Sequence, residues 1–378
     1  MEPYVQRSGR SSIRHLQPSE QLKAWGGAVE RHTAYPPRKK ETKMEQVKIY
    51  TLENETLGVS VSNAGATVLS LELKEDGRPP CDVLLGTPDP GSRLLPGPMF
   101  GATLGRTAGK TMPPAYRCQG KEIRLDPNRQ TYHCHGGFKG FDKQIYEVKQ
   151  ESAASITMCR MSPDGEGGYP GNLQVKIRFS LEHRALCIGY MAKSDRDTVV
   201  SISNHLYFNL NGQGNGDVLG HTVRIPSGRV LHIDGQGVSD GGIRQTAGTP
   251  FDFTRPCRIG EQMAKEDEQL KFAGGFDHTY LREVSAAEPV LEAWGDRSDI
   301  RMRVYTDLPA IQFYVADFEG TGIMGKGGRS YRGRDGFCVE PLFPPNAMNT
   351  DLSPKPVLKA GDTWHYTVRY AFDIGNEG

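Results

Sequence analysis

Four polar residues lie in segments that are otherwise apolar or rich in glycine: His135 in HCHGGFKGFD, His205 in SISNHLYFNL, Asp277 in AGGFDHTY and Glu340 in GFCVEPLFPP. Solvated loop residues are not expected in such surroundings. An imidazole and a carboxylate together can move protons near neutral pH, and burial raises the proton affinity of the carboxylate. His205 and Glu340 are therefore a candidate acid/base pair, although each alone also fits a structural role.

Three further sites in the sequence could have a chemical role. The guanidinium of Arg106, in FGATLGRTAGK, could bind an oxygen-rich ligand or form a surface ion pair. His133 and His135 could present two imidazoles to a metal, but no third ligand follows at a suitable spacing, so no metal is predicted. Cys134 next to His135 is a poor nucleophile candidate, because neighbours on a strand point to opposite faces. A serine nucleophile is not predicted either. The spacing G-x-S-x-G occurs as GVSDG at 237–241, but outside the one segment expected to be helical, so the strand-to-helix turn of a nucleophile elbow is not expected there.

The segments that would position these residues have the pattern of short strands, rich in β-branched and aromatic residues and often alternating in polarity. The chain also contains 45 Gly and 25 Pro, which interrupt helices. One helix is expected, at 259–272. The glycine-rich stretch 212–220 lacks the strand-to-helix context of a phosphate loop and is expected to be a hairpin loop. We therefore predict an all-β protein of two stacked antiparallel sheets. The segments expected to form strands are GVSVSN, TVLSLELK, SITMCRM, LQVKIRFSLE, ALCIGYMAK, TVVSISNHLYFNL, HTVRIP, RMRVYTD, AIQFYVAD and WHYTVRYAF.

Composition excludes several classes of protein. The 378 residues contain 46 Lys and Arg against 45 Asp and Glu, a formal net charge of +1, which argues against a nucleic-acid partner. No run approaches the ~18 apolar residues of a membrane helix, and the first residues lack the apolar stretch of a secretory signal. A cytoplasmic protein is expected. Seven cysteines without a C-x-x-C pair indicate reduced thiols rather than a disulfide framework or a thiolate zinc site.

The N-terminal residues 1–43 differ from the rest of the chain. They carry nine Lys and Arg against four Asp and Glu and show no sustained apolar periodicity. We expect a disordered basic extension there, followed by a single domain at 44–378. A mitochondrial transit peptide is a less favoured interpretation, and Met44 could instead be the start of the folded protein. The intact mass of the protein from its native source would distinguish these alternatives.

Taken in order along the chain, the sequence motifs resemble those of the aldose 1-epimerase (galactose mutarotase) family. Each motif is short, but together they run through roughly residues 47–374, so that their joint order makes the resemblance specific. The matching motifs are NAGAT at 63–67, FGATLGR at 100–106, HGG at 135–137 with GFD at 140–142, SPDG at 162–165, NHLYFNL at 204–210, TPFD at 249–252, GFDH at 275–278, QFY at 312–314 and EP at 340–341.

The resemblance implies a large antiparallel β-sandwich, a galactose mutarotase-like supersandwich, with an open sugar cleft. It implies interconversion of the α and β anomers of free hexoses such as D-galactose and D-glucose, without cofactor or metal, by a monomer or homodimer. Glu340 matches the family's general base and His205 its general acid. Four other residues match positions that bind sugar hydroxyls or steady this pair: Arg106, His135, Asp277 and Gln312.

The sequence departs from the family pattern near several of these positions. Gly109 and Lys110 stand where the family usually has Asn-Arg, Leu206 replaces a Ser and Leu342 a Gln. Asn346 replaces an Asp. The proton-transfer pair is unaffected, but a donor replaced by Leu cannot orient its neighbour. Two alternatives therefore remain: a non-catalytic sugar-binding or sensing module on the same fold, and a mutarotase for phosphorylated sugars.

Overall fold

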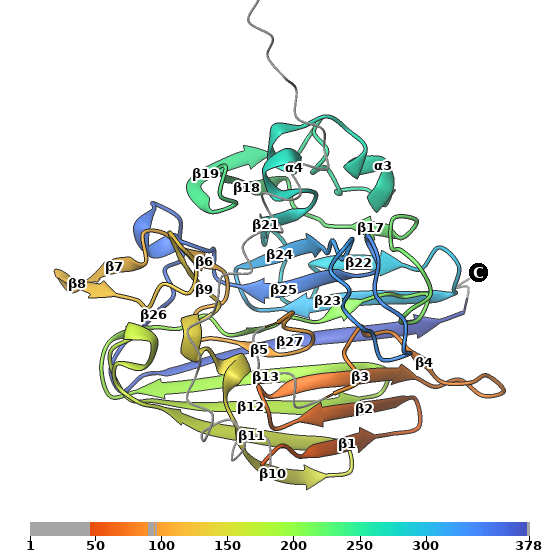
Figure 1. Cartoon of the computed structure of the whole chain (residues 1–378), viewed down its shortest axis with the longest axis horizontal. Helices are drawn as coiled ribbons and strands as arrows, with labels where there is room; N and C mark the ends of the chain where they lie inside the picture. Colours follow the sequence, from red (N-terminus) through yellow and green to blue (C-terminus); the bar gives the residue numbers. More distant parts are fainter. Residues whose placement is uncertain (1–45, 90–93, 95–96, 376–378) are drawn as a thin grey trace, which may run out of the picture. The chain divides into compact units, whose positions relative to one another are not determined.

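The computed structural model describes residues 46–89, 94 and 97–375, and strands and turns dominate this part of the chain (Figure 1). The expectation of an all-β fold built from antiparallel sheets is confirmed. The predicted basic extension at 1–43 lies outside the described residues. Within the described residues, no helix combines the length and the apolarity needed to cross a bilayer.

The largest sheet among the described residues, here called the long sheet, contains nine antiparallel strands. In its middle, Val175 and Ile177 are buried while Lys176 and Arg178 are exposed, the alternation of a sheet with one face in the core. The strands of the long sheet are, in spatial order, β10 (Glu147–Ser152), β11 (Ser155–Ser162), β12 (Leu173–Glu182), β13 (Ala185–Ser194), β27 (Thr363–Ile374), β23 (Ile300–Thr306), β22 (Leu291–Trp294), β17 (Thr222–Arg224) and β20 (Cys257–Arg258).

A second sheet, here called the site sheet, and a smaller third sheet pack with the long sheet around a shared core. Ile177 of the long sheet, Val339 of the site sheet and Val59 of the third sheet belong to one buried apolar cluster. The sheets therefore stack face to face, as expected. The site sheet consists of β16 (Tyr207–Phe208), β25 (Phe337–Leu342), β24 (Ala310–Val315), β21 (Asp277–Leu281), β18 (Arg229–Ile233) and β19 (Ser239–Gln245), and the third sheet of β1 (Ile49–Glu53), β2 (Leu57–Ser62), β3 (Thr67–Leu73) and β4 (Cys81–Asp82).

Strand β25 is buried along its whole length because both of its faces are covered. Phe337 and Val339 point into the shared core, and the alternate residues Cys338 and Glu340 point to the other face. This arrangement explains why the segment has a continuous apolar sequence interrupted by one carboxylate. The carboxylate lies on the face of the site sheet that points away from the core.

Short strand pairs connect the remaining segments to this face. β5 (Thr103–Leu104) pairs with β15 (Ser203–Asn204), and β6 (Lys110–Thr111) pairs with β9 (His133–Cys134). A further pair joins β14 (Thr198–Val199) to β26 (Val357–Leu358).

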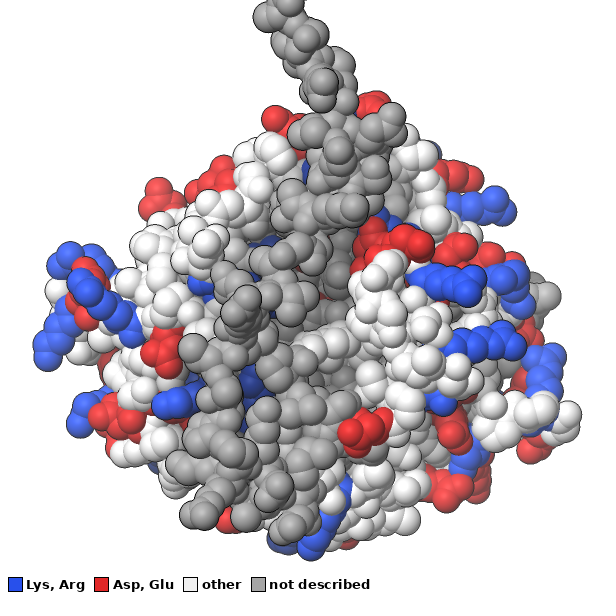
Figure 2. Space-filling model, in the orientation of Figure 1, with Lys and Arg blue, Asp and Glu red and all other residues white. Residues whose placement is uncertain are grey.

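On the face of the molecule in Figure 2, basic and acidic side chains are interspersed, including at the hairpin of β7 (Ala115–Cys118) and β8 (Lys121–Arg124).

The helix expected at 259–272 is two short helices, α3 (Ile259–Met263) and α4 (Glu268–Ala273). Residues 264–267 separate them, and the last of these is Asp267. Its backbone is extended, with φ of −156°, and its carboxylate accepts the backbone N–H of Gln269, which caps the start of α4. The prediction of one helix was wrong because it treated Asp267 as a helical residue rather than as an N-cap.

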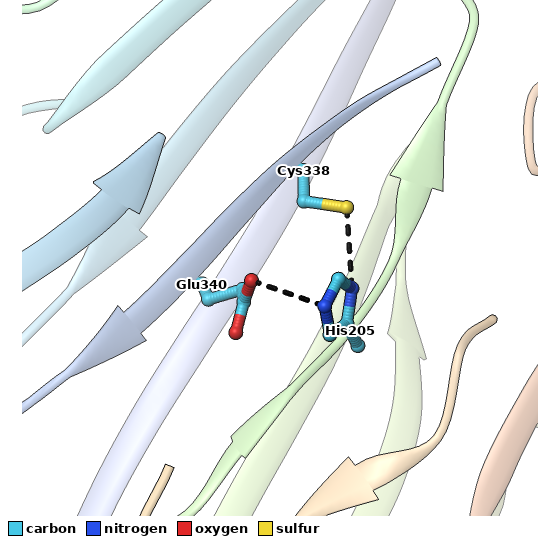
Figure 3. A group of neighbouring side chains, drawn as sticks. All are labelled: His205, Cys338 and Glu340. Atoms are coloured by element: carbon cyan, nitrogen blue, oxygen red, sulfur yellow. Dashed lines mark hydrogen bonds and ion pairs between the residues drawn. The ribbon is translucent and has the colours of Figure 1, made fainter. Parts of the chain in front are cut away.

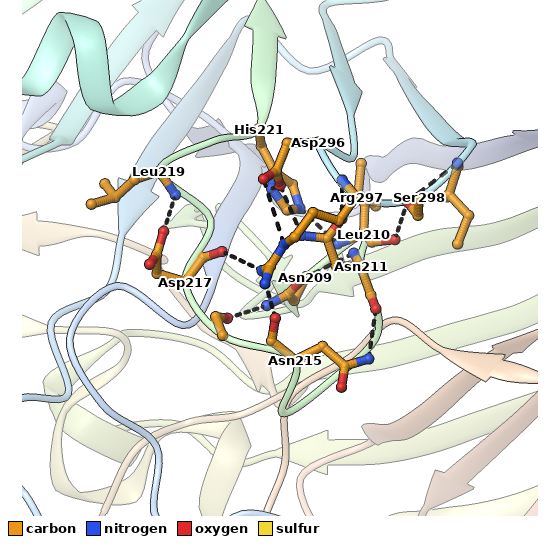
Figure 4. Close-up of polar contacts among 12 residues, drawn as sticks. Asn209, Leu210, Asn211, Asn215, Asp217, Leu219, His221, Asp296, Arg297 and Ser298 are labelled. Carbon is orange, nitrogen blue, oxygen red and sulfur yellow. Dashed lines mark hydrogen bonds and ion pairs between the residues drawn. The ribbon is translucent and has the colours of Figure 1, made fainter.

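The glycine-rich stretch 212–220 connects β16 of the site sheet to β17 of the long sheet, so it is not the hairpin loop that was expected. Polar contacts within the protein hold it in place (Figure 4). The backbone N–H of Leu210 donates to Nε2 of the buried His221 over 2.9 Å, and Arg297 donates to the carbonyl of Asn215 over 2.6 Å. The N–H of Gln213 donates to the carbonyl of Asp82 over 2.7 Å. Several amides that a phosphate would need are therefore already engaged.

Candidate active site

A cavity of about 290 Å³ opens at the outer face of the site sheet. Its volume lies near the lower end of the range for small-molecule sites. Five of the six predicted site residues contribute to its lining: His135, His205, Asp277, Gln312 and Glu340. The sixth, Arg106, lies elsewhere. The fold thus assembles residues that are spread over more than two hundred positions of the sequence.

The register of the site sheet places several of these side chains in rows. Glu340 of β25 lies opposite Gln312 of β24, which in turn lies opposite Thr279 of β21. One step along the same face, Tyr314 of β24 lies opposite Asp277 of β21. Side chains two residues apart on a strand share a face. Antiparallel pairing therefore brings the carboxylates and the amide of three strands to one surface.

His205 follows β15 and is fixed by its backbone. Its N–H donates to the carbonyl of Ala102 over 2.9 Å, and its own carbonyl accepts from the N–H of Gly101 over 2.7 Å. The imidazole stacks on the ring of Tyr207, with centroids 4.7 Å apart and planes 15° apart. These contacts hold the ring so that Nε2 lies 3.5 Å from Oε1 of Glu340 (Figure 3).

The pair of His205 and Glu340 is almost fully buried, with side chains 8% and 3% exposed. Burial raises the pKa of Glu340 well above its ordinary value and lowers the pKa of His205 to about 4, because both charged forms lose solvation. Among the described residues, Oε2 of Glu340 has no hydrogen-bond partner. The two residues therefore share one proton near neutral pH, and one carboxylate oxygen is free to contact a ligand.

His135 lines the cavity from a turn whose contacts fix which of its nitrogens carries the proton. Its φ is +49°, and Gly136 follows with φ of +86°, where a Cβ would lie 1.6 Å from the carbonyl oxygen of Gly105. The HGG motif therefore needs this glycine. Nδ1 of His135 accepts the backbone N–H of Gly109 over 3.2 Å. Burial keeps the pKa of His135 well below its usual value, so the neutral ring carries its proton on Nε2 as a donor.

Asp277 is held in its ionised form by two neighbours. Oδ1 accepts from Nε2 of Gln312 over 2.6 Å, and Oδ2 lies 3.3 Å from Nζ of Lys110. Burial raises the pKa of Asp277, but the charge of Lys110 and the hydrogen bond from Gln312 outweigh it, so that the net pKa is lowered. Nζ of Lys110 also donates to the carbonyl of Gly237 over 2.8 Å.

Lys110 lines the cavity but is not among the six predicted site residues. In the sequence it stands out as a departure from the family pattern. The signal was present in the sequence, because a basic side chain stands four residues after Arg106 in the same glycine-rich motif. What the sequence did not show is that this cation meets Asp277.

The structure places Arg106 outside the lining of the cavity. The residue is 2% exposed, and its guanidinium donates to Oγ of Ser162 and to four backbone carbonyls. The predicted sugar contact of Arg106 does not fit this placement, because its N–H groups are occupied by the turn at 162–171. The sequence could not show where this turn folds. The four carbonyls belong to Ser162, Pro163, Pro170 and Gly171.

Arg106→Met should therefore destabilise the protein, because it leaves buried carbonyls without donors. We expect the free energy of unfolding in urea to fall by about 3 kcal/mol or more, given roughly 1–3 kcal/mol for each buried group left unsatisfied. The matched control is Arg117→Met, at an exposed position on β7, which should change stability by less than about 0.5 kcal/mol. An Arg106→Met variant as stable as the control would contradict this structural role.

The alternatives around β9 gain no support from the structure. Nδ1 of His133 donates to the carbonyl of Asp126 over 2.7 Å, and its Nε2 accepts from the hydroxyl of Tyr169 over 2.7 Å. Both nitrogens are thus engaged away from His135. Burial raises the pKa of Cys134 to about 11, which makes its thiol a poor nucleophile near neutral pH.

Comparison with known proteins shows the family of this chain. The family model for aldose 1-epimerase matches residues 48–371. Galactose mutarotase from Rattus norvegicus is 33% identical over 329 residues, covering 87% of this chain and 94% of the relative, and aldose 1-epimerase from Escherichia coli K12 is 30% identical over 331 residues, covering 86% and 95%. The chain belongs to the aldose 1-epimerase family.

Solved structures show the same fold. Galactose 1-epimerase from Lactobacillus acidophilus superimposes with a TM-score of 0.77 at 27% identity, covering 87% of this chain and 95% of the other. An aldose epimerase homologue from C. elegans gives a TM-score of 0.80 at 23% identity, covering 87% and 100%, which bears on the fold alone. Membership of the family makes this protein an isomerase, a mutarotase, whose substrate is a sugar.

Proposed function

We propose that this mutarotase interconverts the α and β anomers of free D-galactose and D-glucose, with Glu340 as general base and His205 as general acid. The observation that carries the proposal is the 3.5 Å approach of Nε2 to Oε1 beside a cavity of about 290 Å³. The relatives named galactose mutarotase support galactose as a substrate.

Ring opening requires removal of the proton from the anomeric hydroxyl and protonation of the ring oxygen. Glu340 as a carboxylate takes the first proton, and His205 as an imidazolium gives one from Nε2 to the ring oxygen. The C1–O5 bond breaks, C1 becomes an aldehyde, and the pair is left as a neutral acid and a neutral imidazole. Rotation about the C1–C2 bond turns the other face of the aldehyde towards O5. Reclosure returns both protons and gives the other anomer.

Burial suits this cycle because it stabilises the neutral form of the pair. In this mechanism the two residues form an ion pair while the sugar ring is closed, and both are neutral while the ring is open. The raised pKa of Glu340 and the lowered pKa of His205 thus favour transfer of the protons in the direction of opening. No proton is exchanged with solvent in the cycle, since the pair holds one proton before and after.

The polar groups around His205 and Glu340 would bind the other hydroxyls of the sugar. Nε2–H of His135 is a donor, the carboxylate of Asp277 is an acceptor, and Nζ of Lys110 is a charged donor at the same wall. Hydrogen bonds to such charged groups contribute about 1.5–3 kcal/mol each. These groups could orient the sugar so that O1 faces Glu340 and O5 faces His205.

The charges of the cavity favour a free sugar over a phosphorylated one. Among the described lining residues, Lys110 is the sole Lys or Arg, and it is paired with Asp277. A sugar phosphate would bring about two negative charges to this wall. Its binding would require an unpaired cluster of basic residues, which the described lining lacks.

Polarimetry tests the proposal directly. Freshly dissolved α-D-galactose and α-D-glucose should approach their equilibrium rotation faster with the protein than in buffer alone, in proportion to enzyme concentration. Sugar phosphates at equal concentration should not compete. If galactose and glucose both equilibrate at the spontaneous rate, the proposed substrates are wrong. If they also protect the protein against thermal unfolding, the chain binds these sugars without turning them over.

Asp277→Asn should weaken substrate binding more than it slows the chemical steps, because Asp277 lies beside the reacting pair and does not exchange protons in the cycle. We expect KM for galactose to rise about 10-fold or more, the effect of losing one charge-assisted hydrogen bond, with a smaller change in kcat. Progress curves over a range of sugar concentrations separate the two constants. Asp317→Asn, at an exposed position, serves as the control. An unchanged KM in the Asp277 variant would contradict its binding role.

A further inference from the structure

His205 has a second close neighbour besides Glu340. Sγ of Cys338 lies 3.3 Å from Nδ1 of His205, whereas Oε1 of Glu340, from the same strand, lies near Nε2 (Figure 3). The thiol is fully buried and is not part of the cavity lining. Cys338 therefore reaches the substrate only through His205.

The proposed chemistry of His205 and Glu340 requires that Nδ1 of His205 carry a proton. When His205 has given its Nε2 proton to the ring oxygen, Nε2 must be left with its lone pair so that it can take the proton back. The remaining proton of the neutral imidazole must then be on Nδ1. Among the described residues, the side-chain partner of Nδ1 is Sγ of Cys338.

We propose that Cys338 is a positioning residue whose sulfur accepts the Nδ1–H of His205 and so fixes the tautomer that lets Nε2 exchange its proton with the substrate. This inference rests on the proposed role of His205 as the acid. A sulfur atom is a weak acceptor, so it selects the tautomer while adding little stabilisation to the imidazolium. The imidazolium therefore remains acidic enough to protonate an ether oxygen, which is a weak base.

The protonation state of the thiol agrees with this role. Burial raises the pKa of Cys338 well above its usual value, and the negative charge of Glu340 raises it further. The thiol therefore stays neutral, whereas a thiolate would hold the imidazolium as an ion pair and weaken the acid. The other titratable groups that face His205 or act on its charge are His135, Tyr207, Asp277 with its partner Lys110, Tyr314 and Glu340.

The test compares Cys338→Val, which removes the acceptor at similar volume, with Cys338→Ser, which keeps one. The tautomer of His205 is read from ¹⁵N chemical shifts of ligand-free, histidine-labelled protein, with the signal assigned by its absence in His205→Asn. Turnover is followed by polarimetry across pH. Cys187→Val, at a partly buried cysteine on β13 of the long sheet, is the control for loss of a thiol.

We expect wild-type His205 to be neutral with its proton on Nδ1. Cys338→Val should populate the Nε2–H tautomer and lower kcat between about 10- and 100-fold, the loss typical of a partner that orients a functional imidazole, with little change in KM. Cys338→Ser should keep the wild-type tautomer and most of the turnover. Its stronger acceptor should stabilise the imidazolium and move the pH profile of kcat/KM to higher pH. Cys187→Val should match the wild type in all these measurements.

Two results would overturn the proposal: an Nε2–H tautomer in the wild type, or a Cys338→Val variant with unchanged tautomer, whatever its turnover. The shifts are measured without substrate, so they do not depend on the activity. If His205→Asn retains full turnover, the proposed acid role fails, and with it the catalytic meaning of the thiol, although the assigned tautomer would still stand.

Discussion

Glu340→Gln is expected to lower kcat for anomer exchange by at least about 100-fold, the lower limit of what one positioned proton transfer contributes. The amide occupies the same space but cannot accept the proton of the anomeric hydroxyl. KM should change little, because the amide can still form a hydrogen bond with that hydroxyl. The rate is measured by polarimetry with freshly dissolved α-D-galactose, after subtraction of the spontaneous rate.

Stability provides the control for this variant. The pKa of Glu340 is higher in the folded than in the unfolded state, so the unfolded state releases its proton more readily, and this residue costs stability as the pH rises above its unfolded pKa. A neutral amide avoids that cost. Glu340→Gln should therefore be at least as stable as the wild type at pH 7 in urea unfolding. Wild-type turnover in this stable variant would remove Glu340 from the mechanism.

His205→Asn should lower kcat by a similar factor, at least about 100-fold, for a different reason. Asparagine keeps a polar side chain in the cavity but has no proton to give to the ring oxygen. The matched control is His183→Asn, because His183 is exposed and lies in a turn with φ of +49°, a conformation that asparagine tolerates. In polarimetry, the kcat of His205→Asn should be at least about 100-fold lower than that of His183→Asn. Equal rates would show that another group supplies the proton.

The departures from the family pattern have structural explanations that leave the pair intact. Leu206 is fully buried in the shared core and points away from the cavity lining. Leu342 lines one wall of the cavity and packs with Ala310 and Leu104 in a smaller apolar cluster. Gly109 gives its N–H to His135 and has φ of +85°. Gly109 and Leu342 thus contribute to the shape of the cavity, and none of the three residues can supply or remove a proton.

Much of the fold was determined by local sequence. Alternation of apolar and polar residues fixes which face of β12 is buried. This pattern repeats every two residues, so it can be recognised without knowing which strands pair. The apolar run around Glu340 has no such alternation and was not among the segments expected to form strands, although it forms β25. The local motifs also indicated a candidate acid/base pair, His205 and Glu340, although each of these residues alone also fits a structural role.

Only the tertiary structure decided which of these residues meet. His205 and Glu340 are 135 positions apart, and their contact depends on the pairing of β25 and on the backbone bonds that hold His205. The same long-range packing buried Arg106 among backbone carbonyls, brought Lys110 to Asp277 and placed Sγ of Cys338 against Nδ1 of His205. The alternation along a strand determines which face of the strand is buried. Which residue lies next to which depends on strand register and on the packing of turns. Both arise from contacts between segments far apart in the sequence, and the local sequence of neither segment identifies its partner.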